Sequence, residues 1–212
     1  MKKFIKLAAI AAILAPAMFS CSGGGSSSDA PLFGSLPETY GKFVSAKDAL
    51  KAEAENIKSE ADKAKFLEKA EKMQEEWAGK IEEAAKSLDG KPVEFAEGEF
   101  KITEPVSLQF DRFFSKSDLT PAFNVNGQAE AAAEIVTELD YVLPSEGVHI
   151  VGYDAEGQEV YDERIGSVNV ENRDGKVVVP AGSAVKFDSF HFGKSDAESC
   201  PKIATLKLEF RR

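Results

Sequence analysis

The hydrophobic pattern of this 212-residue chain changes its period near residue 90, and this change restricts the folds open to it. Between residues 45 and 90, apolar side chains recur every three or four positions, which is the spacing of one face of an α-helix. From Lys91 onward, apolar and polar residues alternate, as they do in strands that bury one face. The sequence therefore predicts an α+β fold in which a helical segment precedes a β domain.

The predicted helical segment, residues 45–90, is either one long helix or a helical hairpin. A capping-box pattern at Ser45 begins it, and Gly90, which stands shortly before a proline, ends it. A hairpin requires a break near residues 56–59, where Ser59 has the character of a second N-cap. The apolar stripe consists of Ile57, Ala61, Ala64, Leu67, Ala70, Met73, Trp77, Ile81, Ala84 and Leu88. We expect this stripe, with its single tryptophan, to pack within the chain rather than against another protein's helix.

The predicted β domain spans residues 91–212. Its clearest alternations are residues 106–111 and 205–211, and several shorter runs repeat the pattern. Turn signals separate the runs at Asn126-Gly127, Glu156-Gly157 and Asp174-Gly175. Many short strands joined by turns favour an antiparallel β-sandwich.

One segment of the β domain, residues 128–139, fits two patterns. Its alanine-rich composition favours a helix, whereas the turn before it and the strands on both sides favour a strand. We expect a long strand here.

The first 20 residues have the composition of an export signal. Three lysines are followed by thirteen residues of apolar character, Leu7 to Phe19, a run shorter than the roughly 20 residues that a membrane-spanning helix needs. Ser20 and Cys21 stand where cleavage is expected, and a Gly/Ser tract, residues 22–28, begins directly afterwards.

At Ser20-Cys21 the sequence resembles a bacterial lipoprotein precursor. The resemblance implies that the Cys21 thiol receives a diacylglyceryl group, that the signal peptide is cut before it, and that the new N-terminus is acylated. Ser22 after the cysteine, in place of aspartate, implies the outer membrane if the cell is Gram-negative. The alternative is an ordinary secretory signal cut near residues 15–17. In either case residues 21–44 are expected to form a Gly/Ser-rich tether.

The charge of the chain restricts its partners. The full sequence has 26 basic and 36 acidic side chains, and the leader holds three of the lysines and no acid. The remainder thus has 23 basic against 36 acidic groups, a net charge of −13. Nucleic acids and anionic lipids are recognised by clustered basic side chains, so neither is an expected electrostatic partner. The expected contacts are a membrane, through lipid on Cys21, and a glycan or protein ligand.

Cys200 has no partner within the chain if Cys21 carries lipid. We expect a buried, unreactive thiol, because a reactive one needs a neighbouring cation or histidine. His149 and His191 alternate with apolar neighbours and are expected to point off the core face. A zinc site formed by these three residues is a much weaker alternative.

Residues of catalytic or binding character are few. The sequence has no Gly-x-Ser-x-Gly, His-Glu-x-x-His, P-loop or dinucleotide-binding motif. The ligand-binding candidates are exposed aromatic rings that could stack on sugars, namely Tyr141, Tyr153, Tyr161 and the pair Phe113-Phe114. No cofactor is expected.

Acidic residues supply two weaker hypotheses. Asp154, Glu156 and Glu159 could contribute to a calcium site, although their spacing is not that of an EF-hand and a solvated turn is expected instead. Glu159, Asp162 and Glu163 could serve a glycoside hydrolase, which needs two carboxylates across a cleft.

Together these features predict an exported, lipid-anchored envelope protein. Its folded part is expected to be a non-catalytic binding or structural module. Glycan binding through surface aromatics and carboxylate-dependent hydrolysis of a polysaccharide are the alternatives.

Overall fold

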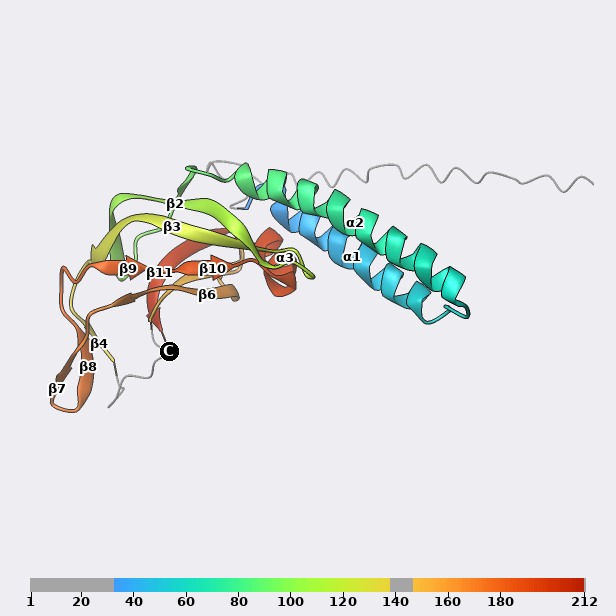
Figure 1. Ribbon diagram of the computed structural model, residues 1–212. Helices are drawn as coiled ribbons and strands as arrows, with labels where there is room; N and C mark the ends of the chain where they lie inside the picture. The colour runs from blue at the N-terminus through green and yellow to red at the C-terminus, as the bar shows by residue number, and fades with distance from the viewer. Residues whose placement is uncertain (1–32, 138–146, 212) are drawn as a thin grey trace, which may run out of the picture.

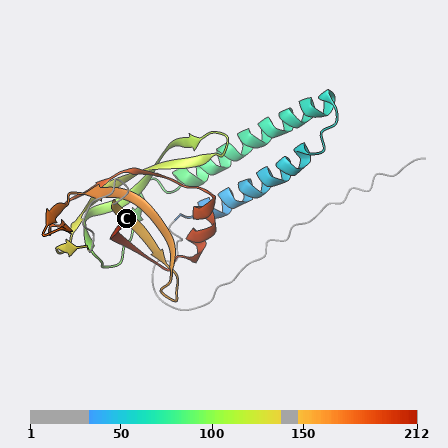
Figure 2. The ribbon, with the colours of Figure 1, turned by 90° about the horizontal axis from the view of Figure 1, so that it is seen from below.

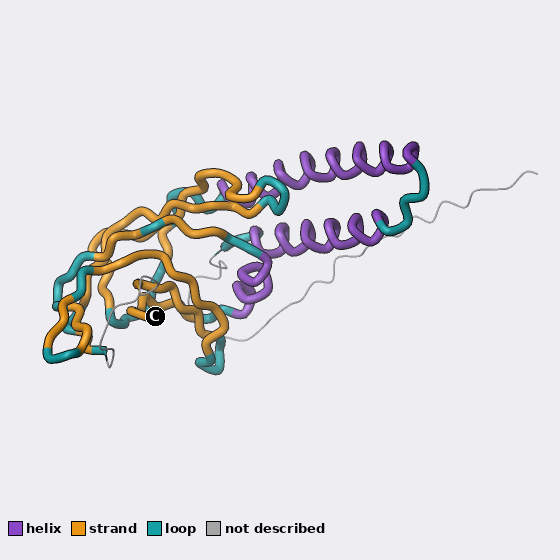
Figure 3. Tube along the Cα trace, turned by 60° about the horizontal axis from the view of Figure 1, so that its bottom comes forward, coloured by secondary structure: helices purple, strands orange, loops and turns teal. Residues whose placement is uncertain are grey.

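The computed structural model describes residues 33–137 and 147–211. It confirms the predicted α+β class, because helices are combined with antiparallel sheets (Figure 1). Two long helices extend from one end of a body of strands, so the described part is elongated (Figure 3). Within these residues, no helix is both long enough and apolar enough to cross a membrane. The signal peptide, Cys21 and Tyr141 lie outside the described residues.

The helical segment contains two helices, α1 (Leu36–Ala54) and α2 (Glu60–Lys86), which lie side by side and run antiparallel (Figures 1 and 2). Ser59 caps α2, because its side-chain oxygen accepts a hydrogen bond of 3.1 Å from the backbone N–H of Asp62. The helices are joined by the tilted rings of Phe43 and Trp77, whose centroids are 6.2 Å apart. Trp77 therefore packs within the chain, as the sequence predicted.

The start of the first helix differs from the prediction. Helix α1 begins at Leu36, and Ser45 lies inside it, donating its hydroxyl to the Gly41 carbonyl instead of capping an N-terminus. Residues 36–44, the last part of the predicted tether (residues 21–44), therefore belong to α1. Proline is tolerated in the first helical turn, so Pro37 does not prevent this start. The early turns are stabilised by burial of Phe33, Leu36, Tyr40 and Phe43.

The apolar stripe of α2 is buried only in its C-terminal half. Ile81 and Ala84 are buried, as is Leu88 just after the helix, whereas Leu67, nearer the free end of the helix pair, keeps 57% of its surface exposed. The reason is visible in Figure 2, where the outer part of the helix pair extends beyond the strands and has only its partner helix to pack against.

The strands form three antiparallel sheets. The first has the order β1 (Pro92–Val93), β2 (Phe100–Ser115), β3 (Thr120–Ala131), β10 (Ser189–His191). The second has the order β11 (Thr205–Arg211), β5 (Gly147–Tyr153), β6 (Glu159–Val168), β9 (Val185–Phe187). The third, smaller sheet has the order β4 (Ile135–Val136), β8 (Lys176–Val179), β7 (Glu171–Arg173). A short helix, α3 (Lys194–Ser199), and a 3₁₀ turn (Cys200–Lys202) connect β10 to β11.

One hydrophobic core joins the base of the helix pair to both four-stranded sheets. At its centre, the ring of Phe33 lies 5.2 Å from that of Phe192 and 6.1 Å from that of Tyr161, between centroids. Tyr40 of α1 meets Phe192 edge-on at 5.9 Å. Aromatic contacts therefore hold together four places in the chain: Phe33 before α1, Tyr40 within α1, Tyr161 in β6 and Phe192 directly after β10.

Residues 128–139 do not form the single long strand that was expected. Strand β3 continues to Ala131, the chain bends at residues 132–134, and Ile135–Val136 then pair with β8 in the smaller sheet. The strand prediction is thus right for residues 128–131 and 135–136, and residues 138 and 139 lie outside the described residues. The pairing with β2 ends here because β2 begins at Phe100, the partner of Ala131. Ala131 also exchanges backbone hydrogen bonds with Gly182 and Ser183.

Candidate functional site

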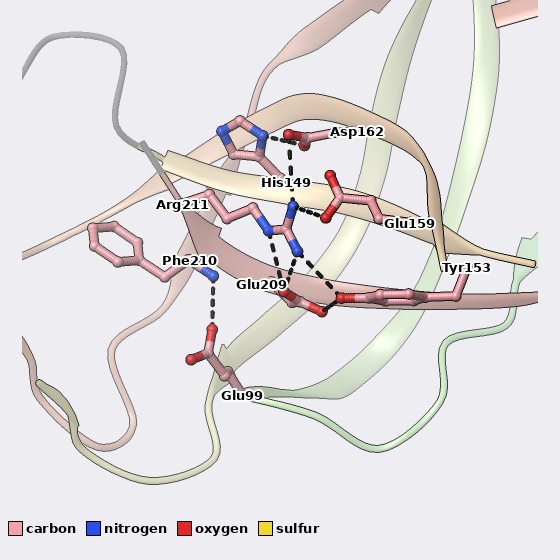
Figure 4. A network of polar contacts seen from close by, with 8 residues as sticks. All are labelled: Glu99, His149, Tyr153, Glu159, Asp162, Glu209, Phe210 and Arg211. Carbon is pink, nitrogen blue, oxygen red and sulfur yellow. Dashed lines mark hydrogen bonds and ion pairs between the residues drawn. The ribbon is translucent and has the colours of Figure 1, made fainter. Parts of the chain in front are cut away.

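Three neighbouring strands place six polar side chains in one connected group, which we call the Arg211 network (Figure 4). Strand β5 supplies two members, β6 two and β11 two: His149, Tyr153, Glu159, Asp162, Glu209 and Arg211. The antiparallel registers put them on the same face, since Tyr153 is opposite Glu159 and His149 is opposite Glu209. The sequence had selected several of these residues separately, and the pairing of strands brings them together.

Arg211 is the centre of this network. Its Nη1 is 2.6 Å from Glu159 Oε2 and 3.7 Å from Asp162 Oδ2, and its Nη2 is 2.8 Å from Glu209 Oε2. Nη2 also donates a hydrogen bond of 3.2 Å to the Tyr153 hydroxyl, which in turn donates one of 2.5 Å to Glu209 Oε1. The Arg211 side chain is only 24% exposed, so these contacts are partly protected from water.

The hydrogen bonds fix the charges of the network at neutral pH. Burial by itself works against the Arg211 charge, but hydrogen bonds to Glu159 and Glu209 outweigh it and raise the pKa of the guanidinium. Burial likewise works against an ionised Glu209, and the hydrogen bonds from Tyr153 and Arg211 lower its pKa. The pKa of Tyr153 is raised by its hydrogen bond to Glu209 and by burial. A charged arginine, an ionised glutamate and a neutral phenol therefore stabilise one another.

His149 is attached to the edge of the network. Its Nδ1 lies 2.6 Å from Asp162 Oδ1, and its Nε2 is buried with no hydrogen-bond partner among the described residues. The sequence placed His149 off the core face, and the histidine lies there on the face of the Arg211 network, although it is only 7% exposed. A histidine held by a carboxylate resembles the base of a nucleophile–base pair, yet in residues 33–137 and 147–211 no hydroxyl or thiol is bonded to Nε2.

The acidic hairpin between β5 and β6 is a turn. Asp154 Oδ1 accepts hydrogen bonds from the backbone N–H groups of Glu156 (3.0 Å) and Gln158 (2.8 Å), and Gly157 has the positive φ of 78° that such a turn requires. Glu159 is held by Arg211, so the three calcium candidates do not converge. Over the described part of the chain, no three His, Cys, Asp or Glu side chains are grouped so as to hold a metal ion.

The predicted aromatic platform is divided among separate places. Tyr153 belongs to the Arg211 network, and Tyr161 is only 4% exposed, so its ring is in the core and cannot stack on a ligand. Phe113 packs on the core, with its ring 5.6 Å from that of Phe110. Phe114 is different, because 64% of its surface is exposed and its ring is stacked on His191.

A second group of titratable side chains lies on the inner side of β6. Burial raises the pKa of Glu163 to about 7, and the charges of Asp196 and Asp162 act in the same direction. Burial also raises the pKa of Asp196, against hydrogen bonds from the backbone N–H groups of Gly193 and Asp196 itself. Burial raises the pKa of Cys200 as well, so this buried cysteine has the unreactive thiol that the sequence predicted.

Glu163 gives the protein an expected pH dependence of stability. Its pKa in the folded state, about 7, is above the ordinary value of 4.5. Between pH 4.5 and pH 7 the Glu163 carboxyl is therefore protonated in the folded chain and ionised in the unfolded chain. The free energy of unfolding should therefore fall as the pH rises from 4.5 through 7. Glutamine is neutral at every pH, so in Glu163→Gln the free energy of unfolding should fall less as the pH rises. Urea unfolding of both proteins at pH 5 and pH 7.5 measures this difference. An equal effect of the substitution at both pH values would contradict this assignment.

Sequence reasoning did not identify Arg211 and Glu209 as members of the network. The alternation in residues 205–211 places both on the polar face of a strand, which is the only local signal they carry. Which residues they contact depends on which strands are neighbours in the sheet.

Comparison with protein-family models, with curated proteins and with solved structures gives no match for this chain.

Proposed function

We propose that the protein is an exported lipoprotein of the cell envelope, anchored by lipid on Cys21, whose folded part is a non-catalytic binding or structural module. The two four-stranded sheets would form a β-sandwich, and α1 and α2 a helical hairpin that projects from it. The observation that carries the proposal is the junction at Ser20-Cys21, between a basic and apolar leader and a Gly/Ser tract.

The state of the carboxylates supports a non-catalytic role over a hydrolase. Glu159 is paired with Arg211, and Asp162 is bonded to His149. Glu163 has its pKa raised together with Tyr161 and Asp196 on the inner side of β6. A glycosidase needs two carboxylates that face one bound sugar from opposite sides. Glu159 and Asp162 instead both lie beside the Arg211 guanidinium, and Glu163 lies on the inner side of β6.

The position of the first buried residue supports anchoring close to the membrane. Phe33 is in the core, and it is only 12 residues after Cys21. An acylated Cys21 would thus hold the base of the helix pair and the sheets near the lipid headgroups. Two or more acyl chains are sufficient for stable attachment, which a net charge of −13 would not provide.

Substitution of the proposed lipidation site tests this function. Cys21→Ser should abolish incorporation of labelled fatty acid and move the protein from the membrane pellet to the soluble fraction. Cys200→Ser is the matched control, because it removes the other cysteine and should leave both readouts unchanged. Retention of Cys21→Ser in the membrane pellet, with label still incorporated, would refute the proposal.

A further inference from the structure

Part of the outer face of the sheet that contains β2, β3 and β10 carries no charged side chain. The outer face of β5, β6 and β11 holds the Arg211 network, whose charged groups are paired with one another. The Lys101–Glu130 ion pair lies on the outer face of β2 and β3. Further along the same face, β2, β3 and β10 present five neutral polar side chains, which we call the amide face: Ser107, Gln109, Asn124, Asn126 and Ser189. The chain has 62 formally charged side chains, and none of them is among these five positions on three neighbouring strands.

Strand register fixes the layout of the amide face. Gln109 is opposite Asn124, which is opposite Ser189, and Ser107 is opposite Asn126. Neighbouring strands are about 5 Å apart, and successive side chains on one face of a strand are about 7 Å apart. The next row along the sheet is Arg112, Ala122 and His191, so the amide face continues directly to the His191 ring.

Phe114 and His191 provide a flat apolar surface at this end of the face. Their ring centroids are 3.8 Å apart with an interplanar angle of 20°, so the rings are stacked. Phe114 nevertheless keeps 64% of its surface in contact with solvent, one of three large apolar side chains exposed among the described residues. An aromatic ring held in place by a partner loses little conformational entropy when a ligand packs on it.

The amide face has hydrogen-bonding capacity that the described chain does not use. Asn126 donates a single long hydrogen bond of 3.3 Å to Gln109 Oε1. In residues 33–137 and 147–211, the side chains of Ser107, Asn124 and Ser189 make no hydrogen bond. Each amide offers two donors and a carbonyl acceptor, and each hydroxyl offers a donor and an acceptor.

We propose that the amide face and the Phe114–His191 stack bind a neutral glycan. The apolar C–H face of one pyranose ring packs on Phe114, and the hydroxyl groups of that sugar and its neighbour bond to Gln109, Asn124 and Asn126. The inference rests on the proposed function as a binding module and names its ligand class and its site. A sugar hydroxyl both donates and accepts hydrogen bonds, and side-chain amides and hydroxyls can serve as its acceptors and as its donors.

Charge complementarity favours a neutral glycan over an acidic one. The five side chains of the amide face carry no charge, and Arg112, the nearest guanidinium, is paired with Asp111 at 3.6 Å. An acidic polysaccharide would meet a protein whose net charge after removal of the leader is −13. A neutral polyhydroxylated chain meets no such repulsion.

Affinity electrophoresis of the full, acylated chain in detergent tests the inference. The gels contain a soluble β-glucan, xylan, galactomannan or starch, with polygalacturonate as the acidic comparison. At least one neutral polysaccharide should retard the protein. Phe114→Ala should weaken that binding at least about tenfold, because the stacking surface is lost, and Asn124→Ala should weaken it by about threefold to tenfold.

Two further variants separate binding from folding. Phe114→Tyr keeps the aromatic ring, so its affinity for the polysaccharide should stay within about threefold of that of the unchanged protein. Leu67→Ala removes another exposed apolar side chain, on α2, and should leave the affinity unchanged. No retardation by any neutral polysaccharide, retardation by polygalacturonate alone, or equal binding by Phe114→Ala would overturn the inference. Membrane fractionation of Cys21→Ser is independent of these gels, so failure of anchoring and failure of glycan binding are distinguishable.

Discussion

Phe192→Ala is expected to lower the free energy of unfolding by about 3–5 kcal/mol. Phe192 is completely buried, and its ring contacts those of Phe33 and Tyr40 at the junction between the helix pair and the sheets. Alanine would remove that apolar surface and leave a cavity that three separate segments border, so none can move in to fill it without disturbing the other two.

Chemical denaturation measures this effect, with far-UV circular dichroism reporting all secondary structure and the fluorescence of Trp77 reporting the helix pair. Leu67→Ala is the control and should change stability by no more than about 0.5 kcal/mol, because Leu67 is largely exposed. A loss below about 1 kcal/mol in Phe192→Ala would show that the aromatic junction is not closely packed.

Arg211→Met should be the second large effect, with a loss of about 2–3 kcal/mol at pH 7. The substitution keeps much of the side-chain volume and removes the guanidinium donors that hold Glu159 and Glu209. Glu209, only 20% exposed, would then be left with Tyr153 as its single hydrogen-bond partner in the network. The cost arises from a carboxylate that stays partly buried without its cation.

The sign of the pH dependence tests the same network. The pKa of Glu209 is lowered in the folded state, so its contribution is present above the ordinary pKa of 4.5 and is lost as the pH falls through the lowered value. The difference in stability between the unchanged chain and Arg211→Met should therefore shrink at acid pH. Urea titrations at pH 7 and pH 3 measure it, and an undiminished difference at pH 3 would contradict the assignment.

Arg173→Met is the matched control for Arg211→Met. Arg173 also pairs with two carboxylates, those of Glu134 and Glu171, but all three side chains are about half exposed. Exposed ion pairs are screened by water and contribute little, so the loss should be clearly smaller than that of Arg211→Met. Equal losses in the two arginine variants would show that burial does not distinguish the networks.

Features that depend on a few consecutive residues were predictable. The change of hydrophobic period near residue 90 gave the order of helices and strands, because periodicity follows directly from backbone geometry. Ser59 was recognisable as an N-cap, and the Asp154 hairpin as a turn, because each uses hydrogen bonds between residues at most four apart.

Features stabilised by distant contacts were not predictable. The start of α1 at Leu36 depends on burial of its first turns against α3 and the sheets, and Pro37 and Gly41 give the local sequence a tether-like composition. Tyr161 was assigned to a surface because its sequence does not reveal which side of β6 is covered. The Phe114–His191 stack joins residues 77 positions apart, on two strands that both pair with β3.

The sequence by itself determined the α+β class, the positions of caps and turns, and the expectation of lipid attachment at Cys21, since all of these follow from local patterns. Only the tertiary structure decided which polar residues share a face. Arg211 meets Glu159 because β5 lies between β11 and β6, and the amide face forms because β10 adds to β3. Strand neighbours and register are properties of the whole packed chain, because each strand must bury its apolar face against segments far away in the sequence.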